Sequence, residues 1–240
     1  MNSNQRRKNE EMVFFRHPFS LEYWRCAAAQ LKNPKMIIIA AILVALRVAL
    51  KSIVIPVGEN LNIYITFFVN ALGGMIFGPV VALLGAAVSD TLGALIFPSG
   101  VYFFPFIFNE MLGSLLYALF LWRRELSTLR VILAKFSVTV LCNLLLNPLL
   151  MIFYYKFLNN GKSYSFVTLP RTIKNLALFP AEAALLVIFL SALIPALKSL
   201  KLIPQGQKNL LLSWKHYVSI AVLTLAAAAI VVVYYVCYLK

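Results

Sequence analysis

Long apolar runs fill this chain, and short segments of turn-forming or charged residues separate them. A helix that crosses a bilayer needs about 20 apolar residues, because the hydrocarbon core is about 30 Å thick. Gly78-Pro79 and Pro98-Ser99-Gly100 supply turns between successive runs. The pattern predicts seven spans, with approximate bounds 35–51, 61–77, 79–97, 101–122, 131–156, 172–197 and 216–239. We therefore expect an all-α, polytopic membrane helix bundle.

Composition supports this class. The 240 residues are 62% hydrophobic and the mean hydropathy is +0.85, whereas soluble domains average about 45–50% apolar residues. Six or seven spans leave no length for a soluble domain of useful size. The polar remainder consists of a basic N-terminal extension, residues 1–34, and a basic linker, residues 201–215.

The net charge of +14 is distributed unevenly between the two sides of the predicted bundle. Fifteen Lys and Arg residues lie in the first 35 residues, in the segment 123–135 and in the segment 198–215, whereas six lie on the opposite side. Because cytoplasmic loops of membrane proteins are enriched in Lys and Arg, this bias predicts a cytoplasmic N-terminus. Orientation and contact with lipid headgroups account for the basicity, and we expect no nucleic-acid partner.

Side chains suited to covalent or metal chemistry are few. Cys26, Cys142 and Cys237 are isolated, and His17 and His216 lie far from the intramembrane carboxylates, so no metal-ligand spacing is present. The sequence contains no HExxH, GxSxG or nucleotide-binding motif. We expect no catalytic site, no cofactor and no metal, and the chain cannot hydrolyse ATP by itself.

Three carboxylates, those of Asp90, Glu110 and Glu182, lie within predicted spans. A charge at the bilayer centre costs roughly 2.5–3.5 kcal/mol on insertion scales, so such residues usually face the bundle interior and are paired. Asp90 lies on a face of small residues, which predicts burial between helices. Its carboxylate either holds neighbouring helices together or contacts a substrate.

Two further patterns indicate a ligand site. Residues 97–108 are dense in aromatic side chains and form either an interfacial belt or a stacking surface for a flat heteroaromatic ligand. Arg171 and Asn175 share a face at the start of the sixth span, where a helix N-terminus beside an arginine suits a carboxylate. Asn143 and Asn147 are four residues apart, and we expect them to face the same cavity.

The first span carries an alanine at every fourth residue, at Ala41, Ala45 and Ala49. In lipid, small residues on one face let another helix approach closely. Arg47 lies roughly opposite this alanine stripe, so we expect the arginine to face the bundle interior and the alanines to face outward. The stripe serves either internal packing or the docking of another membrane protein.

Together these features resemble the membrane-embedded substrate-binding (S) components of energy-coupling factor (ECF) vitamin transporters, most closely the folate-type ones. The resemblance covers roughly residues 35–200. It rests on the alanine stripe, the Gly78-Pro79 turn, the run Asp90…Gly93…Phe97-Pro98-Ser-Gly100 and the segment Leu169-Pro170-Arg171-x-x-x-Asn175. It implies a six-helix domain in a bacterial plasma membrane that binds a vitamin from outside. It also implies that the domain docks through the alanine stripe to a transmembrane coupling protein. Two ATPase subunits power that coupling protein.

From chemistry and position in these motifs we predict ligand-binding roles for Arg47, Tyr64, Ser99, Tyr102, Phe103, Asn147, Arg171 and Asn175. Folate fits this set, since its pterin is planar, its edges are polar and its glutamate tail suits an arginine. The span 216–239 and the long N-terminal extension depart from the six-helix core and are additions to it. The alternatives are an S component for another flat vitamin such as riboflavin, an intramembrane enzyme that uses the buried carboxylates, and a purely structural membrane subunit.

Overall fold

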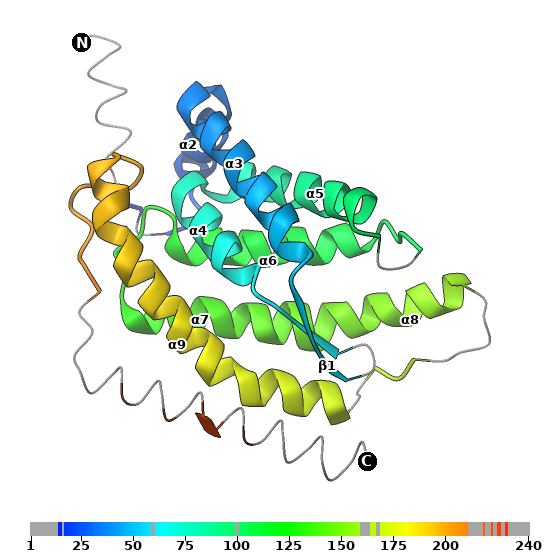
Figure 1. Ribbon diagram of the computed structural model, residues 1–240. Coiled ribbons are helices and arrows are strands. Elements are labelled where there is room, and N and C mark those ends of the chain that lie inside the picture. Colours follow the sequence, from blue (N-terminus) through cyan, green and yellow to red (C-terminus); the bar gives the residue numbers. More distant parts are fainter. Residues whose placement is uncertain are drawn as a thin grey trace, which may run out of the picture.

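The computed structural model describes residues 14–15, 17–58, 61–98, 101–158, 164–166 and 169–210, and the five residues 218, 222, 225, 226 and 229. Apart from those five, the predicted span 216–239 lies outside the described residues. So does most of the N-terminal extension before residue 17. The described chain is a bundle of helices with one short hairpin (Figure 1).

The helical elements, in order, are α2 (Leu21–Ala29), the 3-10 helix η1 (Gln30–Lys32), α3 (Pro34–Lys51), α4 (Phe67–Phe77), α5 (Pro79–Ile96), α6 (Phe106–Leu121), α7 (Thr128–Val138), the π-helical segment η2 (Thr139–Leu146), α8 (Asn147–Leu158) and α9 (Leu169–Ser199). Segments α7, η2 and α8 run on from one another as a single long rod (Figure 1). Between α3 and α4, strands β1 (Val54–Gly58) and β2 (Leu61–Tyr64) pair in antiparallel fashion.

Local sequence sets several helix ends. Asn33 caps α3, because its Oδ1 accepts a hydrogen bond from the backbone N–H of Lys35 at 3.1 Å, and Ser127 caps α7 in a similar way. Gly78 separates α4 from α5 with a φ of 77°, a left-handed conformation that favours glycine. Pro79 then begins α5, where its fixed φ suits a first helical position.

The apolar core lies where α4, α6, α7 and α9 meet, while α5 packs on both α3 and α6. Its fully buried side chains include Ala71, Tyr117, Val131, Leu186 and Leu190. Gly74 lets α4 approach α6 closely, since a β-carbon at this position would lie 2.8 Å from the backbone nitrogen of Ala118. Close packing of small residues replaces the hydrophobic drive that helices lack within lipid.

Three of the described helical segments are long and apolar enough to cross a membrane, namely Pro79–Ile96, Thr128–Leu158 and Arg171–Ser199. The count is four if Leu21–Lys32 and Pro34–Lys51, which meet at 83°, form one span. Helices α4 and α6 are apolar but shorter, with 11 and 16 residues. The prediction of an apolar helix bundle is confirmed, whereas the number of spans stays a prediction.

Two predicted spans begin later than their apolar runs indicated. The run 61–77 starts with β2, whose residues pair with β1 instead of continuing the helix, and α4 begins only at Phe67. Residues 51–60, expected as a loop, supply β1. The run 101–122 becomes helical at Phe106, directly after Pro105. Proline has no N–H to donate and is best tolerated at the start of a helix, so this boundary has a local cause.

Candidate ligand-binding site

A cavity of about 590 Å³ lies among α5, α6, α8 and α9. This volume falls within the range of about 300–1,000 Å³ that is typical of small-molecule sites. The wall also includes Lys51 at the end of α3, Tyr64 in β2, the first turn of α4, the segment between α5 and α6, and residues of α7 and η2. Aromatic, amide and charged side chains from distant parts of the chain therefore converge on one space.

Most of the predicted ligand-binding residues line this cavity: Tyr64, Tyr102, Phe103, Asn147, Arg171 and Asn175. Asn143, which the sequence also assigned to this cavity, lines it too. Ser99 lies outside the described residues. The structure thus brings together side chains that lie more than 100 positions apart in the sequence, and their roles toward a ligand stay predictions.

Arg171 and three asparagines form a connected polar cluster on one part of the wall. The Nη1 atom of Arg171 donates to Oδ1 of Asn147 at 3.0 Å, and Nδ2 of Asn143 donates to Oδ1 of Asn175 at 3.2 Å. Nδ2 of Asn175 donates in turn to the backbone oxygen of Arg171 at 2.9 Å. The guanidinium carbon lies 5.2 Å from the centre of the Tyr164 ring. These contacts hold the Arg171 guanidinium in place, with its other N–H groups as further donors.

Aromatic rings form a second part of the wall. The Phe103 ring centre lies 5.6 Å from that of Phe106 and 5.7 Å from that of Tyr154, with interplanar angles of 76° and 62°. All three residues line the cavity. Edge-to-face rings leave ring surfaces on which a planar ligand can stack. The sequence pattern identified Phe103 but missed Tyr154, which lies on α8 outside the dense aromatic segment.

Each of the three intramembrane carboxylates pairs with a cation from another helix. Asp90 Oδ1 lies 2.6 Å from Lys51 Nζ. Glu110 Oε2 lies 2.9 Å from Arg47 Nη2, and Glu182 Oε2 lies 2.9 Å from Lys135 Nζ. The expectation of paired, inward-facing carboxylates is therefore confirmed. Among the described residues, no group of three or more His, Cys, Asp and Glu side chains is placed to hold a metal ion.

The sequence analysis counted Lys135 among the cytoplasmic charges, and the structure corrects this assignment. Its side chain is 3% exposed, lines the cavity, and lies with Nζ 4.1 Å from the centre of the Phe67 ring. Lys51 and Lys174, counted as charges flanking the spans, also line the cavity. The position of Lys135 inside α7 was the available signal, because a cation at that depth needs a partner such as Glu182.

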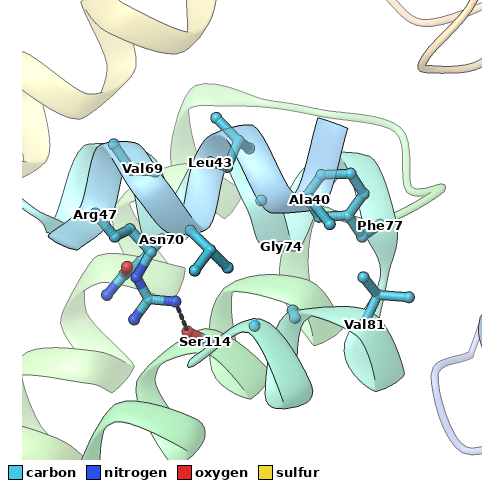
Figure 2. Close-up of a pocket in the computed structure, with 13 residues that line it drawn as sticks. Ala40, Leu43, Arg47, Val69, Asn70, Gly74, Phe77, Val81 and Ser114 are labelled. Carbon is cyan, nitrogen blue, oxygen red and sulfur yellow. Dashed lines mark hydrogen bonds between the residues drawn. The ribbon is translucent and has the colours of Figure 1, made fainter. Parts of the chain in front are cut away.

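Arg47 does not lie in the wall of the large cavity. It is 5% exposed and lines a separate pocket of about 20 Å³ with Asn70 and Ser114, as Figure 2 shows. Its Nη1 atom donates to Oγ of Ser114 at 3.4 Å, and its Nη2 atom donates to Glu110, whose side chain lines the large cavity. The ligand-binding role that the sequence predicted for Arg47 stays a prediction, and its observed partner is Glu110.

The alanine stripe has the orientation that its spacing predicted. Ala41, Ala45 and Ala49 are exposed on α3, whereas Arg47 is buried. The smooth face is therefore available at the surface of the described bundle, and its use as a docking face stays a prediction.

Comparisons with known proteins identify the family. The model of the family described as "ECF-type riboflavin transporter, S component" matches residues 32–194. A protein named Folate transporter FolT from Clostridium novyi (strain NT) is 35% identical over 117 residues, which cover 49% of this chain and 65% of that protein, slightly under two thirds of its length. The Folate transporter FolT of Leuconostoc mesenteroides is 30% identical over 155 residues, or 64% of this chain and 83% of that protein.

A solved structure gives the same result for the fold. The chain described as "Crystal structure of FolT bound with folic acid" is 35% identical, with a TM-score of 0.55, over 63% of this chain and 88% of that one. The family match spans well over half of the 240 residues, and the described helices are those of a multi-pass membrane protein. This chain belongs to the family of ECF-type riboflavin transporter S components.

Proposed function

We propose that this chain is the folate-binding S component of an ECF-type importer. The observation that carries the proposal is a cavity of about 590 Å³ in a fold whose solved relative, at 35% identity, is FolT bound with folic acid. Relatives named Folate transporter FolT in two further organisms indicate the same ligand. In this function the vitamin is bound and released without chemical change, so the wall needs binding groups and no catalytic group.

The wall of the cavity offers chemistry for both ends of folic acid. The rings of Phe103, Phe106 and Tyr154 suit a planar pterin, since offset and edge-to-face contacts favour flat aromatic ligands. Amides such as those of Asn143 and Asn175 can donate to and accept from its polar edges.

The glutamate tail of folic acid requires a cation. Within the described residues Arg171 donates to the amide oxygen of Asn147, whereas Arg47, Lys51 and Lys135 each face a carboxylate. Arg171 is also 8% exposed, so water screens it little. A carboxylate on the ligand would therefore form a charge-assisted hydrogen bond with Arg171 without displacing an ion pair between described residues.

Riboflavin is the second candidate ligand, because the matching family model is described as a riboflavin transporter S component. Equilibrium binding of both vitamins to the purified protein, without partner subunits, decides between them. Tight binding of folic acid and weak binding of riboflavin is the expected result. The reverse result would keep the family and replace the ligand. Failure of both vitamins to bind would overturn the proposal.

The remaining parts of the proposal concern assembly and orientation. The exposed stripe of Ala41, Ala45 and Ala49 supports docking to a transmembrane coupling protein driven by two ATPase subunits. The excess of Lys and Arg on one side of the bundle supports a cytoplasmic N-terminus in a bacterial plasma membrane. Residues 35–200 would form the binding domain, with the extension 1–34, the linker 201–215 and a further helix at 216–240 added to it.

A further inference from the structure

Helix α2 lies outside the region that matches the family model, which begins at residue 32. It meets α3 at 83°. Helix α3 has 18 residues and is therefore about 27 Å long, which is close to the thickness of the hydrocarbon core. A helix that turns almost perpendicular to α3 runs nearly parallel to the membrane plane.

Three different stripes run along α2 and its continuation η1. Tyr23, Ala27 and Gln30 are buried and face the protein. A second, apolar stripe consists of Leu21, Trp24, Ala28 and Leu31, and its two leucines are 67% and 40% exposed. A third stripe, which is exposed throughout, consists of Glu22, Arg25, Ala29 and Lys32. Residues three and four apart share a helix face, so each stripe is continuous.

The buried stripe fixes α2 rigidly to the bundle. The Tyr23 hydroxyl donates to the backbone oxygen of Ala118 at 3.2 Å, and the Tyr23 ring centre lies 4.8 Å from that of Trp122. Phe15 completes this aromatic cluster, with its ring centre 5.4 Å from that of Tyr23. Helix α2 therefore sits where α6 ends, and its other two stripes keep fixed directions relative to the bundle.

We propose that α2 is an interfacial helix that lies in one surface of the bilayer, with its apolar stripe in the acyl-chain boundary and its polar stripe toward the headgroups and water. Helices of this kind combine an apolar face with a face that carries Lys or Arg, and they bind anionic lipid surfaces. The cations Arg25 and Lys32 on the polar stripe supply that charge. Phe19, just before α2 and 84% exposed, adds an aromatic group of the type found at membrane interfaces.

Ala28 and Ala29 provide a matched test, because they are the same residue type, adjacent and both exposed, but lie on different stripes. Each is replaced by cysteine in a full-length background that carries Cys26→Ser, Cys142→Ala and Cys237→Ser. The variants are spin-labelled and reconstituted in vesicles that contain phosphatidylglycerol. Power-saturation electron paramagnetic resonance then compares accessibility to oxygen, which concentrates in lipid, with accessibility to a water-soluble nickel chelate.

We expect the ratio of oxygen to nickel accessibility to be severalfold higher at position 28 than at position 29. Nickel-dominated relaxation at both positions would overturn the proposal, because α2 would then lie in water. Oxygen-dominated relaxation at both positions would also overturn it, because α2 would then continue α3 as a broken span. The pair Leu21→Cys and Glu22→Cys repeats the comparison on the same two stripes, about two helical turns toward the N-terminus. Unchanged elution on gel filtration and unchanged circular dichroism show that each variant is folded.

Discussion

Replacing Arg171 by alanine removes a guanidinium whose surroundings in the cavity are well defined. In the wild-type protein it donates from Nη1 to Asn147 Oδ1 at 3.0 Å and lies 5.2 Å from the Tyr164 ring centre. The residue is only 8% exposed. If the guanidinium holds a carboxylate of the ligand, its removal takes a charged hydrogen-bond partner away from that carboxylate.

The expected magnitude follows from the type of contact. A hydrogen bond to a charged group contributes about 1.5–3 kcal/mol, and removing one partner exposes the full cost of desolvating the other. Every 1.4 kcal/mol changes a dissociation constant about tenfold. We therefore expect Arg171→Ala to weaken folic acid binding by about 10- to 150-fold. Arg171→Lys, which keeps the charge but loses the planar fork, should fall between the wild type and the alanine variant.

Isothermal titration calorimetry with two ligands separates a contact with the ligand from a structural effect. Folic acid carries the glutamate tail with its free carboxylates, and its dimethyl ester keeps the same pterin and ring system with both of these carboxylates masked. For Arg171→Ala we expect the loss of affinity with folic acid, and a change of less than about threefold with the dimethyl ester. Arg130→Ala, at a half-buried position in the first turn of α7 that does not line the cavity, serves as the control variant.

Two results would refute this reasoning. Equal losses for folic acid and its dimethyl ester would show that Arg171 supports the pterin end or the shape of the cavity. Nearly wild-type affinity for folic acid would remove Arg171 from the binding site. A melting temperature within a few degrees of the wild type confirms that the variant protein is otherwise intact.

Three further variants test other features. Asp90→Asn leaves Lys51, 2.6 Å away, without its counter-charge, so we expect the free energy of unfolding in thermal unfolding to fall by about 3 kcal/mol. Replacing both Asp90 and Lys51 by apolar residues should restore most of the lost stability. An unchanged stability of the single variant would contradict the pairing. Gly78→Ala forces a positive φ on an L-residue and places a methyl group 2.6 Å from Cδ2 of Trp122. We therefore expect at least about 2 kcal/mol of destabilisation in the same assay. An unchanged melting temperature would contradict the turn geometry. Ala45→Trp should abolish cellular uptake of radiolabelled folic acid and leave its equilibrium binding unchanged, whereas lost binding would contradict a docking role.

Helical periodicity was enough to predict which faces of the helices point inward. On α3 it separated the buried Arg47 from the exposed Ala45, and on α9 it placed Arg171 and Asn175 together in the cavity. This works because residues three and four apart share a face in any α-helix, whatever the neighbouring helices are. The polar sides of α3 and α9 were therefore readable from the sequence.

Periodicity does not show which helices are neighbours in space. The ion pairs cannot be predicted without knowing which helices pack together. Asp90 meets Lys51, 39 positions away, and Glu110 meets Arg47, 63 positions away. Each pair requires two particular helices to pack in one register. The hairpin of β1 and β2 was missed for a related reason, because a short apolar run is ambiguous between strand and helix until its pairing partner is known.

The π-helical segment η2 shows how a local irregularity completes the cavity. In a regular α-helix Lys135 and Asn147, twelve residues apart, would point about 120° away from each other. In η2 the backbone N–H of Asn147 bonds to the oxygen of Cys142, five residues earlier, so each turn is wider and the rotation per residue is smaller. This smaller rotation brings Asn147 back toward the face of Lys135, and both side chains line the cavity. Pro148, the second residue of α8, cannot donate to a regular helical bond, which favours a break in the α-helical pattern at this point.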